Sequence, residues 1–207
     1  MSQKMEKGFI RNQIWATLVF LGFLSILLGL GYPGIITVIL QTAFNDKANG
    51  SLLIIENQVK GSWLIGQHFT NAHYFWGRPS ALATPYNCAS SGGSNLSPAN
   101  PQQLALITSR VANLQQSSLM PNALIPIDLV TASASGLDPD ISLAAARYQI
   151  PRIAKARELD EDVIHEVINQ QCPNALWGLL DTAHVNVLKL NVDLDKVSQK
   201  HHGVSKT

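Results

Sequence analysis

The chain has 207 residues, a formal net charge of +1 at pH 7, and only 14% charged residues. A nearly neutral chain of this kind has no electrostatic footprint for nucleic acid, so nucleic-acid binding is excluded as its main activity. Its two cysteines, Cys88 and Cys172, are too few for a metal site of their own. Pairing between them requires an oxidising compartment, and the sequence leaves that pairing open.

An uncharged stretch near the N-terminus predicts a membrane-spanning helix. No Lys, Arg, His, Asp or Glu occurs from Asn12 to Asn45, and a charge at a bilayer centre costs about 2.5–3.5 kcal/mol on insertion scales. The apolar core at 14–32 matches a ~30 Å hydrocarbon layer at ~1.5 Å per residue. We expect a cytoplasmic tail at 1–13, a transmembrane helix with its extension at 14–40, an extracytoplasmic α+β domain at 45–197, and a disordered tail at 198–207.

The charges that flank this span predict its orientation. Lys4, Lys7 and Arg11 precede it, whereas the first charge after it is Asp46. The positive-inside rule therefore places the N-terminus in the cytoplasm and the main domain outside. The span exceeds the ~7–15 apolar residues of a signal peptide, and no Ala-x-Ala site follows, so we expect an uncleaved anchor.

Two features inside the span bear on its packing. Pro33 is expected either to kink the helix or to end its membrane portion. Gly22, Ser25 and Gly29 fall on nearly one helical face, where small residues let another helix approach closely. The ordinary abundance of glycine in membrane helices explains the same pattern equally well.

Alternating turn signals and apolar periodicity define the rest of the chain. The expected strands are at 51–55, at 58–65 and, as a closing strand, at 185–194. One helix is expected to begin at Asn100–Pro101, a short helical segment is expected at 128–134, and another helix is expected to be capped by Asp160. A further helix is expected to begin near 136–140, with Asp138 or Asp140 as its cap, and to be kinked or interrupted at Pro151. Strands at both ends with helices between them predict an α+β fold, with a small antiparallel sheet and helices packed on one side.

Two hydroxyl-rich and glycine-rich segments are the candidates for anion binding. The loop at 91–95 has the composition of a nest of backbone N–H groups, and the segment at 131–139 places three hydroxyls before an expected helix start. A flexible loop and ordinary helix capping explain these segments as well. The candidate nucleotide contacts are Ser91, Gly92, Gly93, Ser94, Thr131, Ser133, Ser135, Gly136 and Asp138.

The sequence contains no catalytic motif beside these two candidate anion-binding segments. The glycines at 61–66 have the spacing of a phosphate-binding loop, but Gln67 and His68 stand where that loop needs Lys and then Ser or Thr. The six histidines form no metal-ligand pattern, and no hydrolase motif occurs. We therefore expect no catalytic residue, no metal ligand and no cofactor of the chain's own.

Several short segments, taken together, resemble the C subunit of the Kdp potassium-transporting P-type ATPase, the KdpC family. They follow the expected single N-terminal helix in the family's order, and the resemblance extends to about Leu194. The matching segments are Gly61-Ser-x-Leu-Ile-Gly-Gln-x-Phe69, Tyr74-Phe-x-x-Arg-Pro-Ser-Ala81, Ser91-Gly-Gly-Ser-Asn-Leu96, the run from Pro126 to Pro139, Gln149-x-x-Arg-Ile-Ala-x-Ala-Arg157, and Val185-Asn-Val-Leu-x-Leu-Asn191.

The resemblance implies an accessory subunit in the bacterial plasma (inner) membrane. Its expected partners are a channel-like potassium-binding subunit, an ATP-hydrolysing subunit, a small single-helix subunit and membrane lipid. The complex, rather than this chain, would handle ATP, Mg²⁺ and K⁺. The family is described as a catalytic chaperone that raises the ATP affinity of the hydrolysing subunit.

The orientation of the span favours a structural role at the extracytoplasmic mouth of the potassium path, where ATP is essentially absent. Two alternatives stay open: a regulatory subunit that binds ATP directly, and an anchored ligand-sensing module. The candidate partner or pore-mouth contacts are Arg78, Ser80, Asn95, Asn186 and Asn191.

Overall fold

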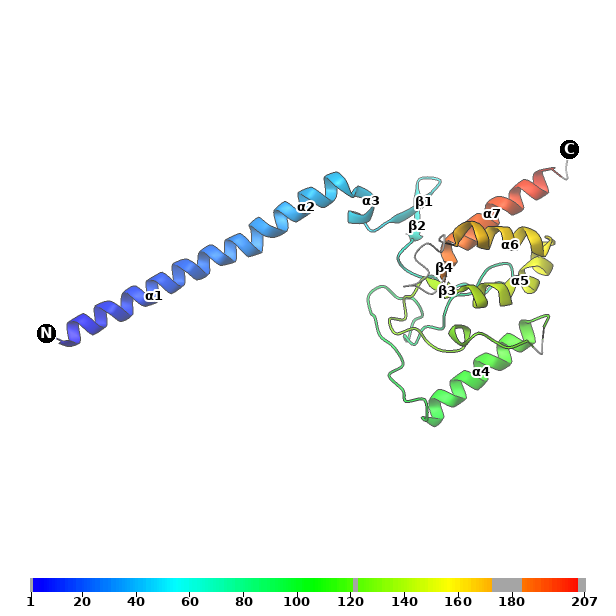
Figure 1. Cartoon of the computed structure of the whole chain (residues 1–207), viewed down its shortest axis with the longest axis horizontal. Coiled ribbons are helices and arrows are strands. Elements are labelled where there is room, and N and C mark those ends of the chain that lie inside the picture. Colours follow the sequence, from blue (N-terminus) through cyan, green and yellow to red (C-terminus); the bar gives the residue numbers. More distant parts are fainter. Residues whose placement is uncertain (1, 121–122, 173–183, 205–207) are drawn as a thin grey trace. The chain divides into compact units, whose positions relative to one another are not determined.

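The computed structural model describes residues 2–120, 123–172 and 184–204. The chain divides into two compact units, Met1–Leu52 and Leu53–Thr207, and each is described by itself. A long apolar helix forms most of the first unit, and helices with two small antiparallel sheets form the second (Figure 1). The predicted α+β fold class with one N-terminal membrane helix is confirmed.

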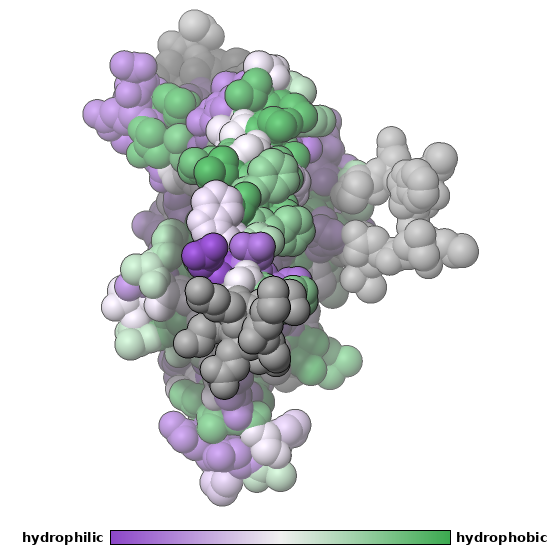
Figure 2. All heavy atoms as spheres, turned by 90° about the vertical axis from the view of Figure 1, so that its left-hand side faces the viewer, coloured by the Kyte–Doolittle hydropathy of each residue, from purple (hydrophilic) through white to green (hydrophobic). Residues whose placement is uncertain are grey.

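The first unit is helical over almost its whole length. Helix α1 (Ser2–Ile26) is followed by the π-helical turn η1 (Leu27–Gly31), α2 (Tyr32–Ala43) and the short α3 (Asn45–Ala48). The stretch Gly8–Ala43 is long and apolar enough to cross a membrane, and none of its most apolar window is buried by the rest of the chain. In Figure 2, hydrophobic side chains cover most of its visible surface beyond the hydrophilic residues next to the grey N-terminal end.

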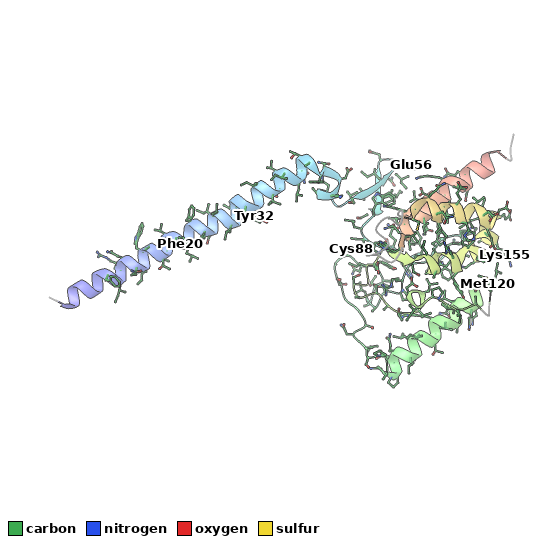
Figure 3. All side chains as sticks on the ribbon, in the orientation of Figure 1. Phe20, Tyr32, Glu56, Cys88, Met120 and Lys155 are labelled. Atoms are coloured by element: carbon green, nitrogen blue, oxygen red, sulfur yellow. The ribbon has the colours of Figure 1, made fainter. Side chains whose placement is uncertain are left out.

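The helix continues past Pro33, and the π-helical turn accounts for this. Proline has no N–H, so the usual hydrogen bond from residue 33 to the Gly29 carbonyl is missing. The Tyr32 N–H bonds instead to the Leu27 carbonyl, five residues back, which widens the helix where the normal ladder is interrupted. Tyr32 and Phe20 both project outward from this rod (Figure 3).

The second unit begins with a hairpin of β1 (Leu52–Ile55) and β2 (Gln58–Ser62). Glu56 and Asn57 form its turn with φ values of 51° and 59°, the left-handed pair that a two-residue hairpin turn requires. The long segment that follows has no regular structure until α4 (Pro101–Ser117). Asn100 caps α4 as predicted, because its side-chain oxygen accepts the Gln102 N–H at 2.8 Å.

The core lies among the remaining elements. These are η2 (Ile127–Leu129), β3 (Asp140–Ser142), α5 (Leu143–Arg157), α6 (Glu161–Gln171), β4 (His184–Asn186) and α7 (Val187–Val204). Strands β3 and β4 pair antiparallel, with Ile141 opposite Val185, and α6 packs against both α5 and α7. Phe75, from the irregular segment, is completely buried among these elements.

Four expectations about this region need correction or qualification. Helix α5 begins at Leu143 and is capped by Ser142, so the predicted caps Asp138 and Asp140 are wrong. The helix is not interrupted at Pro151. Asp160 does precede α6, although its side chain makes no capping hydrogen bond. The expected helical segment at 128–134 is reduced to the single turn of η2.

The predicted closing strand at 185–194 is wrong, because only His184–Asn186 is extended and α7 begins at Val187. The Asn186 side-chain oxygen accepts the Lys189 N–H at 3.0 Å, which is an N-terminal helix cap. Buried Leu190 and Leu194 then recur four residues apart, on one helical face. Helix α7 continues through residue 204, so residues 198–204 are helical rather than disordered, and 205–207 lie outside the described residues.

Candidate functional site

Two loops that were separate candidates in the sequence lie against each other. The Gly92 N–H donates to the Ser135 carbonyl at 2.9 Å, and the Ser91 hydroxyl donates to the same carbonyl at 3.2 Å. A Cβ added at Gly93 would meet the Ala134 carbonyl oxygen at 3.2 Å, so the loops pack closely because this residue has no side chain. We call residues 91–94 with 131–138 the paired loops.

Arg78 joins this cluster through an ion pair. Its Nη1 lies 3.0 Å from Asp138 Oδ2, with both side chains 28% exposed, and its Nη2 donates to the Ala132 carbonyl at 3.4 Å. Gly136 adopts φ +71°, and a Cβ there would meet Ser80 Oγ at 3.0 Å and Leu82 closer still. The structure thus brings Arg78 and Ser80 next to the paired loops.

The hydroxyl groups of Thr131, Ser133 and Ser135 already have partners within the domain. Thr131 Oγ1 donates to the Ile127 carbonyl at 2.8 Å, whereas buried Ser133 accepts the Gly136 N–H at 2.9 Å and Ser135 accepts the Leu137 N–H at 3.1 Å. None of these residues stands at a helix start, because α5 begins only at Leu143. The helix capping that the sequence offered as the alternative to anion binding is therefore wrong for these residues, whose bonds are local turn contacts instead.

Tyr86 contacts the irregular segment that contains Arg78. Its hydroxyl donates to the Arg78 carbonyl at 2.7 Å, and its ring occupies the space that a side chain at Gly66 or Gly77 would fill. Burial, assisted by the negative charge of Asp138, raises the pKa of Tyr86 to about 12. The phenol therefore stays protonated in the folded chain at a pH where an unfolded tyrosine ionises.

This shift predicts a loss of stability at high pH that depends on Tyr86. The folded chain keeps a proton that the unfolded chain releases above pH ~10, so the stabilising contribution is complete below that pH. It disappears as pH rises through about 12, a loss of about 2–3 kcal/mol in the free energy of unfolding. Urea unfolding between pH 9 and 12 should show this fall in the wild type and in Tyr74→Phe, and a clearly shallower fall in Tyr86→Phe. Equal pH profiles for all three would contradict the assignment.

The candidate asparagines separate into different environments. Asn191 is buried and bonds to both the N–H and the carbonyl of Phe75, at 2.8 and 3.1 Å. Asn186 donates to the Trp63 carbonyl at 2.8 Å while it caps α7. Both side chains therefore make hydrogen bonds within the domain. Asn95, in contrast, is exposed, with φ 51°, beside half-buried Ser94.

A buried polar network next to Asn191 was missed by sequence reasoning. The five successive carbonyls of residues 72–76 each accept a hydrogen bond from a side chain of α5 or α7, and we call this stretch the clamped segment. The donors, in chain order of the carbonyls, are Arg152, Arg157, Arg152, Asn191 and Gln149. No pattern in the sequence shows these pairings, because the donors lie more than seventy residues away.

The remaining expectations concern the small residues of the membrane helix, the two cysteines and metal binding. Gly22, Ser25 and Gly29 are exposed on the membrane helix, and a Cβ at either glycine would meet nothing within 4 Å. Cys88 and Cys172 are both free thiols. Within 2–120, 123–172 and 184–204, no group of three His, Cys, Asp or Glu side chains is placed to hold a metal ion.

In the described part of the chain, one helix long and apolar enough to cross a membrane precedes one folded α+β unit, which is the architecture of the class of membrane-anchored proteins. Within that class, the family model KdpC, described as K⁺-transporting ATPase, c chain, matches residues 14–196. The chain belongs to this family.

Similar proteins span almost the whole chain. A protein of Burkholderia cenocepacia (strain HI2424) is 45% identical over 193 residues, which cover 93% of this chain and 100% of the relative. One of Polynucleobacter asymbioticus is 47% identical over 173 residues, which cover 83% of this chain and 92% of the relative. One of Paraburkholderia phytofirmans is 44% identical over 189 residues, covering 91% and 98% respectively. All three are called potassium-transporting ATPase KdpC subunit.

Proposed function

We propose that the chain is a non-catalytic accessory subunit of a high-affinity, ATP-driven potassium-uptake complex, needed for its assembly and activity. The names of its relatives support the subunit role. Its partners are a channel-like potassium-binding subunit, an ATP-hydrolysing subunit and a small single-helix subunit, which handle K⁺, Mg²⁺ and ATP. The exposed small residues Gly22, Ser25 and Gly29 supply a helix face on which one of these can pack in the membrane.

In this proposal the folded domain lies outside the cytoplasm and covers the potassium entrance. The main supporting observation is that one helix of the described residues, Gly8–Ala43, is long and apolar enough to cross a membrane, with Lys4, Lys7 and Arg11 around its N-terminal end. The exposed surface around Ser91 and Asn95 is polar but uncharged, so docking there requires little ion desolvation. Any effect on ATP affinity then acts at a distance, through different binding of this subunit to two states of the pump.

The exposed thiol of Cys88 offers a direct test of this orientation. Figure 3 labels Cys88 in the long loop segment of the folded domain. In a Cys172→Ser variant, a membrane-impermeant maleimide should label Cys88 in intact cells and in right-side-out vesicles. Inverted vesicles should show labelling only after detergent is added. Labelling of sealed inverted vesicles, with none in intact cells, would place the domain in the cytoplasm and overturn the proposal.

A second candidate function is direct ATP binding by the paired loops. It is favoured by one observation, namely that residues 91–93 and 133–136 lie against each other next to Arg78. The internal bonds of the three hydroxyls and the pairing of Arg78 with Asp138 argue against it. Crosslinking with a photoreactive ATP analogue decides between the two: labelled peptides from residues 91–94 or 131–138 would support the second candidate.

A further inference from the structure

A cavity of about 360 Å³ lies between α4 and the irregular segments of the domain. Residues 67–70, 76–80 and 85–86 form one side, and Arg110, Asn113, Leu114 and Leu129 form the other. Its volume falls within the range of small-molecule sites, ~300–1,000 Å³. We call it the α4 cavity. All of its lining residues belong to the second unit, and only Arg78 and Ser80 belong both to it and to the candidate residues named above.

The two formally charged residues that line the α4 cavity are both cationic. Arg78 and Arg110 line it, and none of its described lining residues carries a carboxylate. Arg110 Nη1 donates to the Val130 carbonyl at 2.9 Å, so a neutral main-chain oxygen is its partner there. The positive charge of Arg78 is offset by the carboxylate of Asp138, but the Nε of Arg78 is buried with no hydrogen-bond partner among the described residues. Arg110 thus contributes a positive charge that no acidic group of the lining neutralises.

The remaining walls are mostly apolar. Phe69, Trp76, Leu114 and Leu129 supply hydrophobic surface, while Asn113 lies exposed at the edge. Trp76 stacks on Arg152, whose guanidinium carbon lies 3.8 Å from the ring centre. A site with an aromatic wall and guanidinium groups suits a ligand that joins an anionic group to an apolar body.

We propose that the α4 cavity binds a carboxylate borne on a small apolar group, with Arg110 as its counter-charge and Trp76, Phe69 and Leu114 around the apolar part. The carboxylate belongs either to a free organic acid or to an acidic residue of a neighbouring subunit. Burial lowers the pKa of Arg110, the direction expected where a cation loses part of its contact with water. An anion at this position would restore that lost solvation. The proposal does not depend on which side of the membrane the domain occupies.

The test uses the purified full-length chain in detergent, with benzoate as the probe and neutral benzamide as its isostere. Benzoate should bind, and benzamide should bind at least tenfold more weakly, because only benzoate carries the charge. Arg110→Gln should weaken benzoate binding at least tenfold. Asn113→Trp, which blocks the edge of the cavity without removing a charge, should do the same. Arg147→Gln, at an exposed arginine of α5, is the matched control and should bind benzoate normally.

The outcomes separate cleanly. Equal binding of benzoate and benzamide, normal binding by a folded Arg110→Gln variant, or no binding of benzoate at millimolar concentrations would each overturn the proposal. Thermal unfolding of each variant verifies that it is folded. Repeating the titration with the assembled complex identifies the source of the carboxylate. Binding to the isolated chain alone indicates a cavity filled by a partner's acidic residue, whereas binding to both indicates a free organic acid.

Discussion

Arg152→Ala is expected to lower the free energy of unfolding of the folded domain by about 3–5 kcal/mol. The guanidinium is buried and donates to the Ala72 carbonyl at 2.6 Å, to the Tyr74 carbonyl at 3.0 Å and to Gln149 Oε1 at 2.7 Å. Alanine leaves the Ala72 and Tyr74 carbonyls without these donors, at about 1–3 kcal/mol for each one that stays buried, whereas Gln149 Oε1 keeps the Trp76 N–H at 2.8 Å. It also removes the stacking on Trp76.

The shape of the guanidinium, as well as its charge, is needed here. Burial lowers the pKa of Arg152 to about 10, so the group remains a cation at neutral pH. Arg152→Lys keeps a charge but loses the planar fork, and should recover less than half of the lost stability. Arg147→Ala, an exposed arginine on the same helix, should change stability by less than about 0.5 kcal/mol. Urea titrations followed by tryptophan fluorescence provide the comparison; similar losses for Arg152→Ala and Arg147→Ala would contradict the role of the clamped segment.

Moving the basic residues to the other end of the span should invert the protein in the membrane. The variant carries Lys4→Gln, Lys7→Gln, Arg11→Gln, Asn45→Lys and Asp46→Lys. Orientation follows the excess of Lys and Arg within ~15–20 residues of a span. Labelling of Cys88 by an impermeant maleimide in intact cells should therefore fall from nearly complete to nearly absent.

The matched control is Glu166→Lys, which adds a basic residue on an exposed position of α6, far from the span in sequence. It should leave labelling unchanged. If the five-residue variant inserts normally yet keeps wild-type labelling from outside, the flanking charges do not set the orientation. The fractions labelled before and after permeabilisation distinguish inversion from loss of the protein.

Features governed by neighbouring residues were predictable from the sequence. The span follows from an uncharged run, the cap of α4 from Asn100 and Pro101, and the hairpin turn from Glu56 and Asn57. Helix α7 shows why local patterns also fail. The stretch from Val185 alternates like a strand over a few residues and repeats like a helix over a longer run, and the capping bond from Asn186 accompanies the helix.

The candidate site could not be predicted as a whole, because it is formed by contacts between residues far apart in the sequence, and hydrophobic periodicity does not indicate such contacts. Residues 91–95 and 131–139 were both recognisable as unusual loops, but only the fold brings Ser91 to Ser135. Asn191 was recognisable as a polar residue in an apolar stretch, and its bonds to Phe75 cross 116 positions. The α4 cavity likewise joins Arg110 to residues some thirty positions away in the chain, so neither its charge nor its volume was visible beforehand.

The hydrogen bonds from α7 to the clamped segment have a consequence for biogenesis. Asn191 and Asp195 of α7 bond to Phe75 and Tyr74, so the clamped segment, which α5 also holds, completes its hydrogen bonds only when the last helix has been synthesised. Such high contact order delays folding until the nascent chain is nearly complete, whether it leaves a ribosome or a translocon. Products that stop before α7 would expose Phe75 and its neighbours, which makes them substrates for holdase chaperones and quality-control proteases.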